Sequence, residues 1–223
     1  MDYSNQIKKV KPSVALVLKF TGEKNTLGQE VFYPASGFVY KNKGYLVTCN
    51  HVVVGATKMQ IKFPDNPLAI EATIESQDVI HDIAVLKFND DTKQPLLPSS
   101  SRVDEGMPVF FCGYPISLNV FTTHQGIVSG IVTDPLGNKL YLVDGSNNAG
   151  NSGGPIFDKN GKVVGIMKAK YRDDNDLVLN SVSQLPTGTL SLHGKDLVTI
   201  YQRLINNIQL GMGLATPIQY VNI

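Results

Sequence analysis

The hexapeptide Gly150-Asn151-Ser152-Gly153-Gly154-Pro155 places one serine among glycines. A serine hydroxyl becomes an effective nucleophile only when an adjacent base takes its proton. Glycine at positions 150 and 153 allows a sharp backbone turn and leaves room for a reacting group beside the hydroxyl. The backbone N–H groups of Gly150 and Ser152 could then point at one spot and stabilise an oxyanion there. The pattern indicates a nucleophile with its oxyanion hole, although on its own it also fits a glycine-rich loop between two strands.

Two earlier segments carry side chains that could activate this serine. His51 follows the apolar stretch Leu46–Cys49, and an imidazole at the end of a strand could serve as a general base. Asp82 precedes the apolar segment Ile83–Lys87, and a buried carboxylate holds an imidazole in the tautomer that accepts a proton. Either residue alone is equally compatible with a structural role. Their order in the chain, His51, Asp82 and then Ser152 with separations of 31 and 70 residues, is one in which catalytic triads occur.

Short strands must position these three residues. The apolar segments are rich in Val, Ile, Phe and Tyr and are separated by Gly, Pro, Asn and Asp, a pattern typical of a β-sandwich or of β-barrels. The predicted strands are Val14–Phe20, Gly37–Tyr40, Tyr45–Thr48, Lys58–Phe63, Ala69–Ser76, Ile83–Lys87, Pro108–Gly113, Thr122–Thr133, Lys139–Val143, Pro155–Phe157, Val163–Lys168 and Gly213–Pro217.

Three segments depart from the strand pattern. His51–Ala56 is predicted to form one helical turn. Lys195–Ile208 repeats apolar residues at helical spacing between Gly194 and Gly211, which predicts a helix whose apolar stripe packs against a core. The polar stretch Thr92–Gly106, rich in Pro and Ser, is expected to connect two halves of the fold.

Composition narrows the choice of partners and compartments. Of the 223 residues, 42% are apolar and 17% are charged, with a formal net charge of +1, which argues against nucleic acid or an anionic membrane as the main partner. No apolar run approaches the roughly 20 residues needed to span a bilayer. The two cysteines, Cys49 and Cys112, are expected to be buried free thiols, and the N-terminus shows no signal-peptide pattern. A reducing, intracellular (cytoplasmic) location is therefore expected.

These segments, taken together, resemble trypsin-like peptidases, and most of all the protease domain of the HtrA family. The resemblance extends from about Ile7 to the last residue, and its most specific part is the serine motif with its chain order. The segments that carry it are Ser36–Val39, Leu46–Val53, His81–Lys87, Gly113–Pro115, Gly126–Ser129, Gly150–Pro155, Gly161–Ile166 and Gly211–Val221.

The resemblance implies an all-β, trypsin-like fold of two six-stranded antiparallel β-barrels, with the predicted helix inserted near the C-terminus. A single protease domain, 1–223, would comprise an N-terminal barrel at about 7–92, a linker at about 93–106 and a C-terminal barrel at about 107–223. The implied activity is that of a serine endopeptidase that cleaves protein or peptide substrates through an acyl-enzyme, without a metal or organic cofactor. Its expected role is intracellular regulation or protein quality control.

Several residues depart from the family pattern. Ser146 stands about where a trypsin-like pocket holds an aspartate, so a preference for Arg or Lys before the scissile bond is not expected. Asn151, rather than an aspartate, precedes the nucleophile, which argues against activation by a freed N-terminus and favours ordering of a loop. The insertion between Ile166 and Gly211 could cover the cleft or bind a regulatory partner. The predicted walls of the substrate pocket are Ser146, Asn147, Asn148, Lys168, Ala169 and Lys170.

Three alternative functions are also compatible with parts of the sequence. Gly150-x-Ser152-x-Gly154 also fits the nucleophile elbow of α/β-hydrolases, but that fold needs its histidine after the serine, where only His193 lies. A protease fold can also serve as an inactive binding or scaffold module. The third alternative is a metal site, and the spacing of its possible ligands matches no compact zinc pattern. Those ligands would be Cys49, Cys112, His51, His81, His124 and His193. The oligomeric state is left open.

Overall fold

The computed structural model describes residues 2–66, 68–116, 118, 120–170, 185–201 and 211–223. These residues fall into two compact units, one comprising residues 1–170 with 211–223 and the other residues 171–210. The candidate active-site residues all belong to the first unit, whose two barrels are described first.

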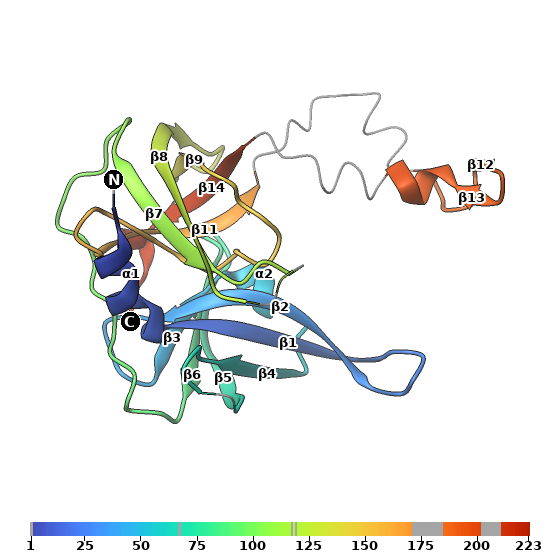
Figure 1. Cartoon of the computed structure of the whole chain (residues 1–223), viewed down its shortest axis with the longest axis horizontal. Helices are drawn as coiled ribbons and strands as arrows, with labels where there is room; N and C mark the ends of the chain where they lie inside the picture. Colours follow the sequence, from blue (N-terminus) through green and yellow to red (C-terminus); the bar gives the residue numbers. More distant parts are fainter. Residues whose placement is uncertain (1, 67, 117, 119, 171–184, 202–210) are drawn as a thin grey trace. The chain divides into compact units, whose positions relative to one another are not determined.

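The first barrel closes six antiparallel strands in the order β1-β2-β3-β6-β5-β4 (Figure 1). Their interior faces are apolar, and β3 is paired with β6 so that Leu46 lies opposite Leu86. The strands are β1 (Val14–Lys24), β2 (Glu30–Val39), β3 (Tyr45–Thr48), β4 (Lys58–Lys62), β5 (Ile70–Asp78) and β6 (Ile83–Phe88).

The second barrel closes the remaining long strands in the order β10-β11-β14-β9-β8-β7. It consists of β7 (Pro108–Gly113), β8 (Thr122–Thr133), β9 (Lys139–Asp144), β10 (Pro155–Phe157), β11 (Val163–Lys170) and β14 (Met212–Pro217). The predicted fold of two six-stranded antiparallel barrels is thus confirmed. The segment between β6 and β7 touches both barrels, through isolated bridges from Leu96 to Tyr40 and from Pro98 to Val163. The finer domain boundaries stay predictions.

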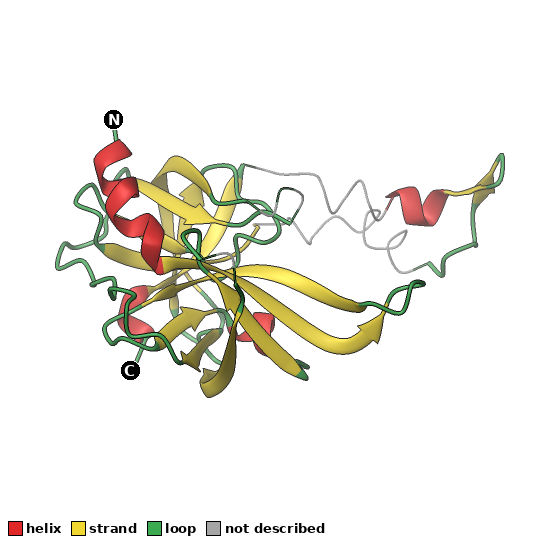
Figure 2. Cartoon of the chain, turned by 60° about the horizontal axis from the view of Figure 1, so that its bottom comes forward, coloured by secondary structure: helices red, strands yellow, loops and turns green. Residues whose placement is uncertain are grey.

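The hairpin of β1 and β2 is longer than the sequence predicted. Residues 21–24 continue β1 and residues 30–36 begin β2, and the hairpin extends beyond the rest of the barrel (Figure 2). The outer part is largely exposed, and even Phe32 and Tyr33 are each 44% exposed, so it lacks the alternation of buried and exposed residues from which a strand is predicted. Cross-strand pairing, rather than burial, sustains this part of the hairpin.

A short N-terminal helix, α1 (Ser4–Val10), was not predicted. Only Val10 is buried within it, so the segment carries no apolar stripe. Tyr3, just before the helix, is buried against Phe110 with ring centroids 4.8 Å apart, and Phe110 stacks on Phe157 at 4.7 Å. Tertiary contact with β7 and β10 therefore anchors the segment, because a helix this short is unstable in isolation.

The second unit contains a two-stranded hairpin of β12 (Ser191–Leu192) and β13 (Lys195–Asp196), followed by helical residues 197–201. The predicted helix start at Lys195 is therefore wrong. His193 and Gly194 form a turn with positive φ angles, and the Asp196 carboxylate accepts hydrogen bonds from Val198 N–H and the Thr199 hydroxyl. This cap fixes the helix start, and the rest of the predicted helix, 202–208, lies outside the described residues.

Substitution of the barrel core should cost far more than substitution at the surface. Leu46 is fully buried on β3, the strand that leads to His51. Leu46→Ala is expected to lower the free energy of unfolding by about 2–5 kcal/mol, the usual cost of a cavity in a core. Leu136→Ala, in an exposed turn where the side chain is 73% exposed, should change it by no more than about 0.5 kcal/mol. Urea unfolding of both variants measures the difference, and equal costs would contradict this account of the core.

Candidate active site

His51 lies in α2 (Asn50–Val53), the short helix that follows β3. Val52 and Val53 are buried and fix the helix against the barrel. The imidazole of His51 is left 48% exposed. The predicted helical turn is therefore present, one residue earlier than expected, and it presents a histidine to solvent at the barrel edge.

Asp82 lies in the turn between β5 and β6 with a φ of +57°, a left-handed conformation that aspartate tolerates better than most residues. Its carboxylate is nearly buried, with a side-chain exposure of 11%. Oδ1 accepts the backbone N–H of His51 at 2.8 Å, and Oδ2 lies 2.8 Å from His51 Nδ1. The Asp82 carbonyl also accepts the N–H of Asn50. The turn is thus attached to α2 at three points.

The interaction with Asp82 determines which ring nitrogen of His51 can accept a proton. An ionised carboxylate can only accept hydrogen bonds, so Nδ1 carries the hydrogen that it donates to Asp82. In the neutral imidazole, Nε2 then holds a lone pair and can accept a proton. Sequence order suggested this arrangement, and the structure brings the two side chains together as expected.

Ser152 lies on the loop between β9 and β10, and both barrels hold this loop. The carbonyl of Ser152 accepts the N–H of Ser36 from the first barrel at 2.9 Å. The next residue, Gly153, donates its N–H to the carbonyl of Met167 on β11 at 2.7 Å. Gly150 and Gly153 both have positive φ angles, and a Cβ at either would collide with neighbouring backbone. These two glycines are therefore required by the tight path of the loop.

The Ser152 hydroxyl donates to the carbonyl of Lys168 at 2.9 Å. Within the part of the chain that the structure describes, it makes no hydrogen bond to His51. The ammonium group of Lys168, however, lies 3.9 Å from Asp82 Oδ2. Lys168 therefore contacts both Ser152 and Asp82, which places the three predicted residues around one location with the serine hydroxyl turned towards Lys168.

The loop leaves two backbone donors unused. The N–H groups of Asn151, Gly153 and Gly154 bond to carbonyls of the protein. Those of Gly150 and Ser152 have no acceptor among the described residues. Neighbouring N–H groups that converge in a loop with a left-handed residue form an anion-binding concavity. These are the two donors that the sequence pointed to.

Ser36 is a positioning residue that sequence reasoning did not identify. It is fully buried on β2, and its hydroxyl donates to the Gly150 carbonyl at 2.7 Å while accepting the N–H of Tyr114 at 2.9 Å. Its own carbonyl accepts the hydroxyl of Thr48. The only signal for it was its place in the segment Ser36–Val39, which gave no indication of contact with a loop 114 residues later.

The predicted substrate-pocket residues divide into two groups. Ser146 is exposed, Asn147 is buried and Asn148 is intermediate on the loop before Ser152. The ammonium group of Lys168 faces Asp82, away from a position in which it would line a pocket with the loop residues. Ala169 and Lys170 continue β11. The role of these residues in a substrate pocket stays a prediction.

Cys49 lies beside His51 and Asp82, and ligand atoms of all three come within 4.8 Å of one another. The thiol donates to the Met167 carbonyl, and burial together with the Asp82 charge raises the pKa of Cys49 well above its ordinary value. A thiol binds metal as its thiolate, so this set is poorly suited to a metal ion. Other members of the alternative metal set have separate surroundings: His81 pairs with Asp78 at 2.6 Å, and His124 stacks on Phe111.

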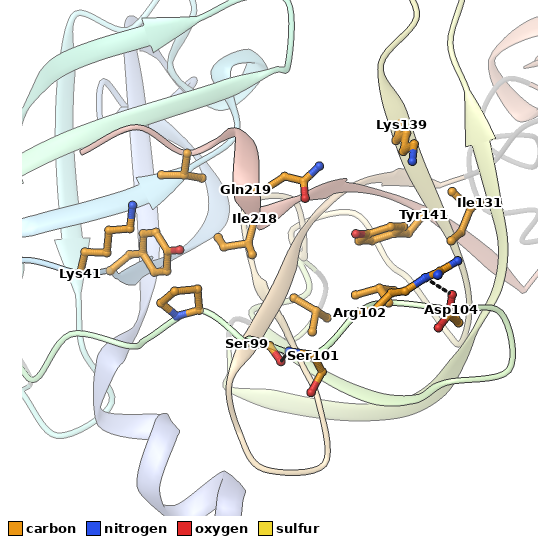
Figure 3. Close-up of a pocket in the computed structure, with 15 residues that line it drawn as sticks. Lys41, Ser99, Ser101, Arg102, Asp104, Ile131, Lys139, Tyr141, Ile218 and Gln219 are labelled. Atoms are coloured by element: carbon orange, nitrogen blue, oxygen red, sulfur yellow. Dashed lines mark hydrogen bonds and ion pairs between the residues drawn. The ribbon is translucent and has the colours of Figure 1, made fainter.

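A cavity of about 380 Å³ lies apart from these residues (Figure 3). It is lined mainly by the segment before β7, by β9 and by the residues after β14, and its lining includes none of His51, Asp82 and Ser152. Arg102 forms an ion pair with Asp104 at its rim, while Lys41 and Lys139 lie on opposite sides of it (Figure 3). These cations do not converge on one point, so the geometry of the cavity does not define an anion site.

Comparison with known proteins gives a family. The sequence model of the trypsin-like peptidase domain matches residues 35–166, which include His51, Asp82 and Ser152. A serine protease Do-like HtrA of Bacillus subtilis is 34% identical over 154 residues, covering 63% of this chain and 34% of the relative. The serine endoprotease DegS of Escherichia coli is 30% identical over 181 residues, covering 78% and 50%. The chain therefore spans between a third and a half of the length of these relatives.

Solved structures share the fold. The HtrA-type protease AlgW with a tripeptide superimposes with a TM-score of 0.73 at 22% identity, covering 98% of this chain and 60% of that chain. The Rv3671c protease in an inactive form gives 0.69 at 20% identity, covering 96% and 88%. The family model covers more than half of the sequence, and two closed six-stranded barrels surround the matching motifs. The chain belongs to the trypsin-like peptidase domain family, and it is similar to proteases of the HtrA type.

Proposed function

We propose that the chain is a serine endopeptidase in which His51, Asp82 and Ser152 form the catalytic triad. The observation that carries this proposal is the double attachment of His51 to both carboxylate oxygens of Asp82, at 2.8 Å each. It fixes the imidazole in the tautomer that accepts a proton at Nε2. The endoprotease names of the DegS relatives support the same activity.

The first step transfers a proton and forms a covalent bond. The Ser152 hydroxyl turns from the Lys168 carbonyl towards His51 Nε2, which takes its proton as the oxygen attacks the carbonyl carbon of the peptide. His51 returns the proton to the leaving amine when the C–N bond breaks, leaving an acyl-enzyme on Ser152. A water molecule, activated by His51 in the same way, then hydrolyses the ester and restores the serine.

The backbone N–H groups of Gly150 and Ser152 form the oxyanion hole in this proposal. Both lack an acceptor within the described residues, so no internal hydrogen bond must break before they bind the developing charge. Donors that are already oriented stabilise the transition state without reorganisation. The hydroxyl of Ser36 supports them indirectly, because it holds the Gly150 carbonyl on the other side of the loop.

A second candidate function is that of a latent or inactive binding module. The bond from the Ser152 hydroxyl to the Lys168 carbonyl favours it, because this hydroxyl is not engaged with its base. The active state would require the Ser152 side chain to turn its hydroxyl to His51, and such side-chain rotations are rapid in exposed residues. We therefore place the active enzyme first, and labelling of the serine distinguishes the two.

The proposed substrates are proteins or peptides with an uncharged, small or medium residue before the scissile bond. The loop residues Ser146, Asn147 and Asn148 would line the pocket for that residue, and none of them carries a charge. A regulatory role in a reducing, intracellular compartment also stays a proposal, supported by the buried free thiols of Cys49 and Cys112. Among the described residues, no helix has the length and hydropathy of a membrane span.

A fluorophosphonate probe should label the wild-type protein at Ser152. The reagent reacts with a serine only when a base activates it, so labelling reports an assembled site without requiring a known substrate. Mass spectrometry identifies the modified residue, and Ser152→Ala should abolish the label. Well-folded wild-type protein that takes up no label would favour the latent module instead.

Asp82→Asn should lower the labelling rate by about 10³–10⁴-fold, because an amide at this position stabilises the wrong imidazole tautomer. The chain offers a matched control in Asp78→Asn, which alters a second aspartate–histidine pair only four residues away. That variant should keep its labelling rate within a few-fold of wild type. Similar losses in both variants would show that the effect is structural rather than catalytic.

Gly150→Ala should lower kcat/KM at least 10²-fold, the typical cost of losing one oxyanion-hole donor. Its φ is +97°, and an added Cβ would press into the backbone of Tyr114 and Ile116, which displaces the N–H group. Gly137→Ala imposes comparable backbone strain at a φ of +88°, in open space within a distant turn. It should leave kcat/KM unchanged, and a peptide-cleavage assay on both variants would reveal the contrast.

A further inference from the structure

Lys168 contacts two residues of the proposed triad with different parts of the residue. Its ammonium group faces the Asp82 carboxylate, and its backbone carbonyl faces the Ser152 hydroxyl. Its Nζ lies 3.9 Å from Asp82 Oδ2, the same oxygen that pairs with His51 Nδ1 at 2.8 Å. Its carbonyl accepts the Ser152 hydroxyl. The Lys168 side chain is only 28% exposed, and that of Asp82 is 11% exposed. The ion pair is therefore screened less than a pair on the open surface.

The other ionisable groups on the surrounding elements are engaged in other interactions or are neutral. The Cys49 thiol stays neutral because burial and the Asp82 charge raise its pKa. His81, next to Asp82 in the chain, pairs with Asp78. Asp134, in the turn after β8, feels the charge of Lys168 but is tied to Asn138. Among the described residues, Asp82 is the carboxylate with which Lys168 forms an ion pair, although the Lys168 charge also acts on Cys49 and Asp134.

Asp82 Oδ2 therefore interacts with both His51 Nδ1 and Lys168 Nζ. When His51 takes the serine proton, its positive charge must share Asp82 with the ammonium group of Lys168. A nearby cation disfavours a second positive charge, so Lys168 makes the protonated imidazole less stable than Asp82 alone would. We propose that Lys168 is a positioning residue that shares the Asp82 carboxylate with His51 and extends to lower pH the range over which His51 can accept a proton. This inference rests on the proposed role of His51 as the base.

The sign of the effect is testable by removing the charge. In Lys168→Met, Asp82 would attract the imidazolium without competition, so His51 would become protonated at higher pH. The pH at which His51 is half protonated is expected to rise by about 0.5–1 unit. This is the size expected for two unit charges several ångströms apart in a partly solvated site. Lys168→Arg keeps the charge and should keep the wild-type behaviour.

The measurement is an NMR titration of the His51 imidazole, identified by the loss of its signal in His51→Gln. The pH at half-change of the signal should rise by about 0.5–1 unit in Lys168→Met and in the second neutral variant, Lys168→Gln. It should stay within about 0.2 unit of wild type in Lys168→Arg. Lys162→Met is the matched control, since it removes one charge from the exposed turn before β11. An unchanged midpoint in both neutral variants, or an equal rise in Lys162→Met, overturns the inference.

A second readout separates this inference from the proposed function. The rate of fluorophosphonate labelling is measured against pH for the same variants, and its acidic limb should move with the NMR midpoint. If the His51 signal shifts but wild-type protein is never labelled, the electrostatic coupling stands and the proposed enzyme activity fails. If Ser152 is labelled but neither the NMR midpoint nor the acidic limb moves, the activity stands and the role of Lys168 fails.

Discussion

The candidate site depends on the attachment of one loop of the second barrel to the wall of the first. Ser36 provides this attachment through its backbone N–H to the Ser152 carbonyl and its hydroxyl to the Gly150 carbonyl. Ser36 is fully buried, where an unpaired polar group costs free energy, so these bonds hold the loop and β2 in a fixed position relative to each other. His51 and Asp82 lie on the first barrel and Ser152 on the second. Because the three residues come from both barrels, neither barrel alone contains the candidate site.

The close backbone approaches follow from the same attachment. Gly153 lies against Ser36 and Thr48 where the loop meets the first barrel, and Gly150 lies against the segment that follows β7. In this confined loop the N–H groups of Asn151, Gly153 and Gly154 donate to protein carbonyls, whereas those of Gly150 and Ser152 have no acceptor among the described residues. The unused donors of Gly150 and Ser152 are therefore a product of the way the loop is held. The attachment of the loop to the first barrel therefore accounts for both the close backbone approaches and the two available donors.

The sequence was most informative where function depends on contiguous residues. The glycine-flanked serine, the histidine after an apolar strand and the aspartate before another could be recognised because each has a local pattern. The outer hairpin, α1 and the true start of the helix at 197 could not, because pairing, tertiary contact and a side-chain cap determine them rather than apolar periodicity. The hydrogen bonds of Ser36 and the approach of Lys168 to Asp82 were equally hidden. They join residues 114 and 86 positions apart, which become neighbours only when the barrels close.

The left-handed backbone at Asp82 has a consequence for how this protein can change over generations. Few residues adopt a φ of +57° at low cost, chiefly Gly, Asn and Asp. Random substitution at this codon would therefore yield mostly chains with a strained turn beside α2, whatever their effect on chemistry. Selection for a folded protein alone would already favour a short polar residue here. The requirement for foldability thus restricts this position to Asp, Asn or Gly, and only the chemistry requires the carboxylate, so a lineage that lost the activity would be expected to keep one of these three residues.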